Sequence, residues 1–202
     1  MKIFGDAMIL CGGKSSRMGF DKSLLKVNGK YVINIMADKL RQVFDDISLC
    51  ANTPDKFEGF GLPIASDFYN EGIGPVAAIH TALSIAKSQY VFVVAVDMPL
   101  LNLEYIRHMM KVLKATTPPP LALVPMVGGF MESTHAFFSV DALGFIDEQI
   151  RAGNFSVNKI LKGLNAICLQ EEESRGFDRD LTMFTNLNYV EDLDKIGGIS
   201  YD

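Results

Sequence analysis

The amino-acid sequence predicts an α/β fold, a three-layer α/β/α sandwich around a mostly parallel, twisted sheet. Strand-like and helix-like hydrophobic periods alternate through the first half of the chain. The segment 90–96, YVFVVAV, is a continuous run of β-branched and aromatic residues, which indicates a strand covered on both faces. A glycine-rich segment, LCGGKSSRMGFDKSLL, directly follows the first apolar run, as in many α/β ligand sites.

The elements of the first half follow from these periods in order. An apolar run over 4–10 predicts the first strand, and helical spacing from Val32 to Phe44 predicts the first helix. We expect two further strands, at 47–51 and, weakened by its proline, at 62–65. Helices are then expected at two places, after Gly74-Pro75 and after an Asn102 cap through Leu113, because proline suits a first turn and asparagine an N-cap.

The pattern loosens after the proline triplet at 118–120. The apolar segments 121–126 and 131–138 flank Gly128-Gly129 and predict a hairpin or strand pair. Helical spacing predicts two helices and a short strand after them, at 142–151, 157–164 and 166–169. We interpret the three glutamates at 171–173 as a solvated charge run.

Composition limits the classes of partner. The chain has 202 residues, 49% of them hydrophobic, which is enough for one core of ordinary size. A net charge of −5 argues against a nucleic-acid or anionic-membrane partner. Three dispersed cysteines provide neither a disulfide framework nor a zinc site, and no apolar run is long enough to cross a membrane. We therefore expect a cytoplasmic protein with a small-molecule ligand.

The glycine-rich segment has the chemistry of an anion site. Glycine residues free backbone N–H groups, and the interleaved Lys14, Arg17 and Lys22 add fixed positive charge. Its spacing matches neither GxGxxG nor GxxxxGK[ST], so the Rossmann dehydrogenase and P-loop ATPase interpretations lose support.

Polar residues follow the other predicted strands at the points where they end. Asn52 follows the second strand, Asp67 the third and Asp97 the long apolar one. Because the carboxyl ends of parallel strands meet at one edge of a sheet, we expect these side chains to converge beside the glycine segment. The sequence therefore predicts a ligand site at this edge.

The same segments carry a resemblance to a known family. LCGGKSSRMGFDKSLL resembles the LAGG-xSxRMG-xDKxLL signature of the MobA-like nucleotidyltransferases. Four later segments are similar to the family's later motifs, in the right order: SDFYNEGIGPVAAIHTAL, VVAVDMPLL, ESTHAFFSVDAL and MFTNLNYVEDL. The resemblance implies the Rossmann-like sandwich of the nucleotide-diphospho-sugar transferases as a single domain, 1–202. Its residues 1–117 would form a nucleotide-binding half and 118–202 an acceptor-side half.

Within this family the chain is most similar to the molybdenum cofactor guanylyltransferases. The resemblance implies a magnesium-dependent transfer of GMP from GTP to the molybdopterin cofactor, which forms the guanine dinucleotide cofactor and pyrophosphate. It also implies a monomer, with a molybdenum-insertion protein or a molybdoenzyme chaperone as further partners.

The resemblance also implies roles for individual residues. Arg17, Lys22 and Asp97 would be catalytic, with Asp97 holding Mg²⁺ through a hard oxygen ligand. Asn186 and Asn188 would contact the acceptor. The residues that would bind the nucleotide are Leu10, Cys11, Gly12, Gly13, Lys22, Asn52, Asp67 and Asp97. The three histidines, His80, His108 and His135, are scattered along the chain and are interpreted as structural or exposed.

Two alternatives stay open from the sequence. The first is cytidylyl transfer to molybdopterin, or nucleotidyl transfer to a sugar or polyol phosphate. Gly12-Gly13 and Asp21 favour guanine, because cytidylyl relatives commonly carry Ala-Gly and a proline there. The second is a nucleotide-sensing module without catalysis, against which the Lys22 and Asp97 pair argues.

Overall fold

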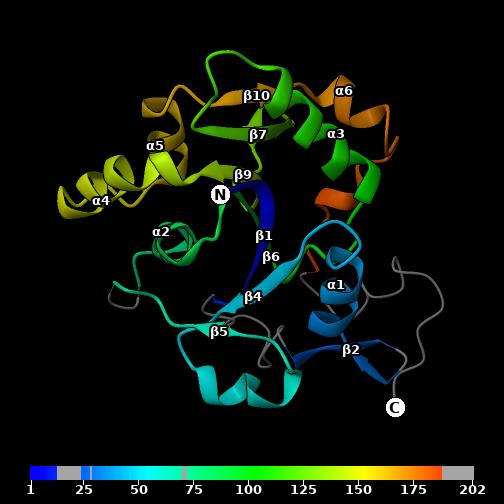
Figure 1. Cartoon of the computed structure of the whole chain (residues 1–202). Coiled ribbons are helices and arrows are strands. Elements are labelled where there is room, and N and C mark those ends of the chain that lie inside the picture. The colour runs from blue at the N-terminus through cyan, green and yellow to red at the C-terminus, as the bar shows by residue number, and fades with distance from the viewer. Residues whose placement is uncertain (13–23, 28, 70–71, 188–202) are drawn as a thin grey trace.

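The structure, a computed structural model, describes residues 1–12, 24–27, 29–69 and 72–187 of the chain. Within them one eight-stranded sheet forms the centre of the molecule, and a small two-stranded sheet lies beside it (Figure 1). The strands are β1 (Lys2–Leu10), β2 (Lys26–Val27), β3 (Lys30–Tyr31), β4 (Asp46–Cys50), β5 (Ile64–Ala65), β6 (Ser88–Ala95), β7 (Ala122–Val127), β8 (Phe130–Met131), β9 (His135–Ser139) and β10 (Ile167–Leu169).

Helices cover both faces of the large sheet. The helices are α1 (Val32–Leu40), α2 (Pro75–Ile85), α3 (Leu103–Ala115), α4 (Leu143–Arg151), α5 (Val157–Gly163) and α6 (Glu171–Arg175), with 3₁₀ turns at Pro54–Phe60, Val140–Ala142 and Thr182–Phe184. In Figure 1, α1, α3 and α6 lie on one side of the sheet and α2, α4 and α5 on the other. The predicted three-layer α/β/α sandwich is thereby confirmed. Among the helices of the described residues, none has both the length and the hydropathy that a membrane crossing requires.

The sheet is mostly parallel, as predicted. Its order is β10-β7-β9-β6-β1-β4-β5, with β8 paired to β7. β6, β1, β4 and β5 are parallel neighbours, and β10 is parallel to β7. Only β8 and β9 among these strands run in the opposite direction. The carboxyl ends of β1, β4, β5, β6 and β7 therefore all lie at one edge.

The central strands are apolar because both of their faces are buried. In β1, Ala7 and Ile9 belong to the core on the α1/α3 side, whereas Met8 and Leu10 belong to the core on the α2/α4 side. Successive side chains of a strand alternate between faces, so a strand covered on both sides cannot show polar alternation. The same burial explains the continuous apolar run of β6.

Two helix starts agree with their sequence signals. The Asn102 side chain accepts a hydrogen bond of 3.0 Å from the backbone N–H of Tyr105, which caps α3 as predicted. α2 begins at Pro75 directly after Gly74, whose φ of +78° lies in the region that glycine tolerates best. These two signals therefore determine where α2 begins after β5 and where α3 begins after β6.

One sequence interpretation needs correction and another needs a structural addition. The predicted strand 131–138 is divided, because a turn at 133–134 separates β8 from β9. The charge run at 171–173 is solvated at Glu172 and Glu173, as interpreted, and it forms the first turn of α6, where acidic residues are favourable. Glu171 in addition accepts hydrogen bonds from the β7–β8 turn and from Arg175.

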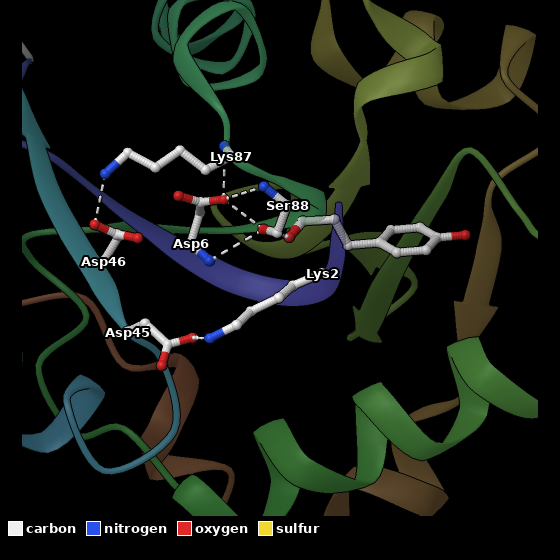
Figure 2. Close-up of polar contacts among 7 residues, drawn as sticks. Lys2, Asp6, Asp45, Asp46, Lys87 and Ser88 are labelled. Carbon is white, nitrogen blue, oxygen red and sulfur yellow. Dashed lines mark hydrogen bonds and ion pairs between the residues drawn. The ribbon is translucent and has the colours of Figure 1, made fainter.

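Charged side chains join the strands at the opposite edge, where β4 and β6 begin (Figure 2). The Asp6 carboxylate of β1 accepts hydrogen bonds from the backbone N–H groups of Lys87 and Ser88, at 3.0 and 2.6 Å, and from the Ser88 hydroxyl. Lys87 also pairs with Asp46 of β4, at 2.7 Å. We interpret this network as structural, because it fixes the mutual alignment of β1, β4 and β6.

Candidate active site at the carboxyl edge of the sheet

Backbone hydrogen bonds bring the ends of the four parallel strands to the same level. The N–H of Cys11 donates to the carbonyl of Cys50 at 2.8 Å, and the N–H of Ala51 to the carbonyl of Ala65 at 3.0 Å. The N–H of Val96 donates to the carbonyl of Leu10, also at 3.0 Å. The segments that follow β1, β4, β5 and β6 thus begin side by side, which is the convergence that the sequence predicts.

The described part of the glycine segment leaves its backbone accessible. Leu10 is buried, Cys11 is half-buried and Gly12 is exposed. A Cβ atom built on Gly12 would have no described neighbour within 4 Å. Asn52 is exposed at the neighbouring strand end. The remaining residues of the predicted site, Gly13, Arg17, Lys22 and Asn188, lie outside the described residues, and their roles stay predictions.

Asp67 is held by a thiol from the neighbouring strand. The Cys50 Sγ donates a hydrogen bond to the Asp67 Oδ1 across 3.0 Å. Burial raises the pKa of the Cys50 thiol, and the adjacent carboxylate raises it further, so this group stays protonated and keeps its role as donor. The half-buried Asp67 therefore has a fixed orientation at the carboxyl edge.

The segment that carries Asp67 is also attached to helices on one face of the sheet. The backbone N–H of Phe68 donates to the Thr81 hydroxyl of α2 at 3.1 Å. The Tyr69 hydroxyl donates to the Asp147 carboxylate of α4, and this bond is the largest cause of the lowered pKa of Asp147. Arg151 pairs with the same carboxylate at 2.9 Å. Sequence patterns gave no signal for this network, since Tyr69 and Asp147 are far apart in the chain.

Asp97 lies just beyond β6 and contacts the C-terminal segment through its backbone. Its side chain is half-buried, and its carbonyl accepts a 2.7 Å hydrogen bond from the N–H of Leu187. The exposed Asn186 is consequently near Asp97, although the two are 89 positions apart in the sequence. The structure thus brings Asn186 to the edge that also carries Asp67 and Asp97.

A second carboxylate, Glu132, lies close to Asp97. Burial raises the pKa of the half-buried Glu132, and the negative charge of Asp97 raises it further. The N–H of Ala95 donates to the carbonyl of Thr134 at 2.9 Å, which aligns the Glu132 segment with the end of β6. No local pattern in the sequence marks Glu132, because only the antiparallel pairing of β9 with β6 brings it here.

These donors suit a hard divalent cation. Carboxylate oxygens are the ligands that Mg²⁺ prefers, and Mg²⁺ keeps several waters or substrate phosphates as its other ligands. Two neighbouring carboxylates are therefore enough protein donors for a magnesium ion shared with a nucleotide. No group of three or more possible metal ligands occurs among the described residues, so a closed structural metal site is not found there.

The fold belongs to the α/β class in which ligands bind outside the carboxyl ends of a parallel sheet, and the candidate site lies at that edge. The model of the MobA-like NTP transferase domain matches residues 7–167, and the chain belongs to this family.

Individual relatives cover almost the whole chain. It is 38% identical to the "Probable molybdenum cofactor guanylyltransferase" of Peptoclostridium acidaminophilum over 95% of this chain and 88% of the relative. It is equally identical, 38%, to the molybdenum cofactor guanylyltransferase of Syntrophotalea carbinolica, over 95% of this chain and 90% of that one.

Solved structures show the same fold. The molybdopterin-guanine dinucleotide biosynthesis protein A of Archaeoglobus fulgidus superposes with a TM-score of 0.79 at 26% identity, covering 94% of this chain and 95% of that one. The 4-diphosphocytidyl-2C-methyl-D-erythritol synthase of Anaerococcus prevotii superposes with a TM-score of 0.63 at 14% identity, covering 95% and 93%. The second likeness supports the fold alone, which is the nucleotide-diphospho-sugar transferase type expected from the sequence.

Proposed function

We propose that this protein transfers GMP from GTP to the molybdopterin cofactor, forming the guanine dinucleotide cofactor and pyrophosphate. The family match and the names of the two relatives described above support the reaction. The structural observation that carries the proposal is the meeting of Asp67, Asp97 and residues 10–12, where the glycine segment begins, at one edge of the sheet. A nucleoside triphosphate with its metal ion needs carboxylates and free backbone N–H groups close together.

In the proposed step, an oxygen of the terminal molybdopterin phosphate attacks the α-phosphorus of GTP. The new phosphorus–oxygen bond forms as the bond to the bridging oxygen of the β-phosphate breaks, and pyrophosphate leaves with that electron pair. The attacking oxygen is already anionic, so no side chain has to remove a proton from it. The task of the protein is to position two anionic substrates and to stabilise the charge on the leaving group.

The roles follow from this division. Asp97 would hold Mg²⁺, and Glu132 is near enough to add negative charge beside it. When bound, the magnesium ion would neutralise triphosphate charge and stabilise the leaving pyrophosphate. Arg17 and Lys22 would contact the triphosphate, as the family signature implies. Leu10 to Gly13, Asn52 and Asp67 would hold the nucleoside, with Asp67 oriented by Cys50.

A pyrophosphate-release assay tests the reaction. Purified protein is mixed with Mg²⁺, molybdenum cofactor and one of GTP, CTP or ATP. We expect release with GTP and only when the acceptor is present. Faster release with CTP would replace guanylyl by cytidylyl transfer, and GTP binding without release would identify a nucleotide-sensing module.

The attachment of the Asp67 segment to α4 predicts an effect on nucleotide affinity. Asp147→Ala removes the acceptor of the Tyr69 hydroxyl, and the freed segment should raise the Kd for GTP about fivefold, the usual effect of one positioning hydrogen bond. Calorimetric titration with GTP and Mg²⁺ measures it. Asp147→Asn, which keeps an acceptor oxygen for Tyr69, should recover most of the affinity. Glu148→Gln is the matched control, because Glu148 is the exposed neighbour of Asp147. An unaltered Kd for GTP in Asp147→Ala would exclude a role of Asp147 in positioning the Asp67 segment.

A further inference from the structure

The β7–β8 hairpin presents an exposed aromatic ring. Its two turn residues are Gly128 and Gly129, with φ of +56° and +81°, and such a two-residue turn favours glycine at both positions. Phe130 follows immediately and is 71% exposed, more than any other phenylalanine among the described residues. Burying this ring in the core would be worth about 2 kcal/mol, so its exposure at a tight turn needs an explanation.

The hairpin tip is held in place from the neighbouring helix. The N–H of Gly128 donates to the Glu171 Oε2 at 2.6 Å. The other oxygen of Glu171 accepts two hydrogen bonds from the Arg175 guanidinium, at 2.7 and 3.0 Å. A ring on a braced tip loses little further conformational freedom when a ligand covers it, which favours binding.

The strand directions place this tip at the edge of the candidate active site. β7 runs antiparallel to β9, which runs antiparallel to β6, so β7 ends at the same edge as β6. The N–H of Glu132 donates to the carbonyl of Pro125 at 2.9 Å and extends the pairing of β8 with β7 by one residue.

The ring lies on the same face of the hairpin as Glu132. Residues two apart on a strand project from the same face, so Phe130 and Glu132 share one, about 7 Å apart along the strand. The pairing of β9 with β6, continued by the hydrogen bond from the Ala95 N–H to the Thr134 carbonyl, places the Glu132 segment beside the end of β6 that leads to Asp97. Phe130 therefore lies farther along the hairpin than Glu132, past the carboxylates of Glu132 and Asp97. In the strand order, this hairpin is on the opposite side of β6 from β1.

We propose that Phe130 binds the acceptor by stacking on its pterin ring. This inference rests on the proposed function, since the acceptor is then a planar heteroaromatic ring joined to the phosphate that attacks. That phosphate has to reach the neighbourhood of Asp97, whereas the flat ring needs an apolar surface at a distance from it. The exposed ring of Phe130 provides this surface. The nucleoside would bind elsewhere on the same edge, near Asp67, so the two substrates would not compete for one place.

The chain contains no tryptophan, so Phe130→Trp introduces a single fluorophore at the hairpin tip. With GTP and Mg²⁺ present, molybdenum cofactor and the simpler pterin biopterin should each quench its emission in a saturable way. Ile85→Trp is the control, because Ile85 is exposed at the end of α2, near the opposite edge of the sheet. Equal responses of the two variants, or no saturable quenching at Phe130→Trp, would overturn the proposal.

Kinetics separate stacking from a structural role. Phe130→Ala should raise the KM for molybdenum cofactor roughly tenfold, within the usual range for loss of one stacked ring, while the KM for GTP stays constant. Phe130→Tyr should restore the KM, whereas Phe130→Leu, apolar without an aromatic face, should not. An unaltered cofactor KM in an active Phe130→Ala enzyme refutes the inference alone, and absence of GMP transfer by the wild-type protein refutes the proposed function. A dimer that Phe130→Ala dissociates in sedimentation would instead assign the ring to self-association and also overturn it.

Discussion

Asp97→Asn should lower the rate of GMP transfer by about 10²–10³-fold, the usual loss when one preorganised electrostatic contact is removed. Asparagine keeps the size of the side chain and one oxygen but removes the negative charge that a divalent cation needs. The rate is measured as pyrophosphate release at saturating GTP and molybdenum cofactor. A smaller loss at raised Mg²⁺ concentration is expected, because excess metal compensates for weaker binding.

The substitution should leave the fold intact. Asp97 holds the C-terminal segment through its backbone carbonyl, which the change retains, so the melting temperature should stay close to that of the wild-type protein. Asp45→Asn is the control, because Asp45 is an exposed aspartate paired with Lys2 near the opposite edge of the sheet. Lys22→Ala is expected to lose activity to a similar extent, from the family signature. Full activity of folded Asp97→Asn would refute the assignment.

His135→Leu should stabilise the protein and reduce its sensitivity to acid. His135 of β9 is completely buried, and neither of its ring nitrogens has a hydrogen-bond partner among the described residues. It packs against Phe92 and Phe184, with ring centroids 5.2 and 5.1 Å away. Burial lowers the pKa of His135 to about 3, from 6.5 in an exposed histidine. Replacing unsatisfied buried nitrogens by apolar atoms of similar volume should add about 1–3 kcal/mol at pH 7.

The pH dependence follows from the direction of this shift. Below pH 6.5 the unfolded chain binds a proton at His135 that the folded chain does not, so the free energy of unfolding falls as the pH falls toward 3. This residue alone should cost about 2 kcal/mol between pH 7 and pH 5. Urea denaturation at both pH values measures the loss, which His135→Leu should reduce by that amount. His108→Gln is the control, because His108 is a half-buried histidine that pairs with Glu173. If wild type and His135→Leu lose the same free energy of unfolding between pH 7 and pH 5, His135 is not the source of the acid sensitivity.

The sequence was most informative where local chemistry decides the structure. The apolar run of β6 and the Asn102 cap of α3 could be predicted, because each depends on a few adjacent residues. The parallel strand ends with Asn52, Asp67 and Asp97 followed from the same strand predictions. The antiparallel insertion of β9 between β6 and β7 could not be predicted, since nothing local specifies which strands pair.

The unpredicted parts of the site all depend on such long-range pairing. Glu132 reaches Asp97 only through the register of β9 on β6, and Tyr69 reaches Asp147 only through the packing of α4 against α2. The thiol of Cys50 could be placed on a strand from sequence, but its bond to Asp67 requires β5 to be the neighbour of β4. Composition carries no information about these contacts.

We propose that the carboxyl edge of the sheet, and not the charged opposite edge, binds the nucleotide and its metal ion. A crystal structure with GTP and Mn²⁺ in place of Mg²⁺ tests it, since manganese gives an anomalous signal. We predict a peak in direct contact with the Asp97 carboxylate and a triphosphate at the end of β1. A nucleotide beside Asp6, Asp46 and Lys87, or a metal peak remote from Asp97, would contradict the account.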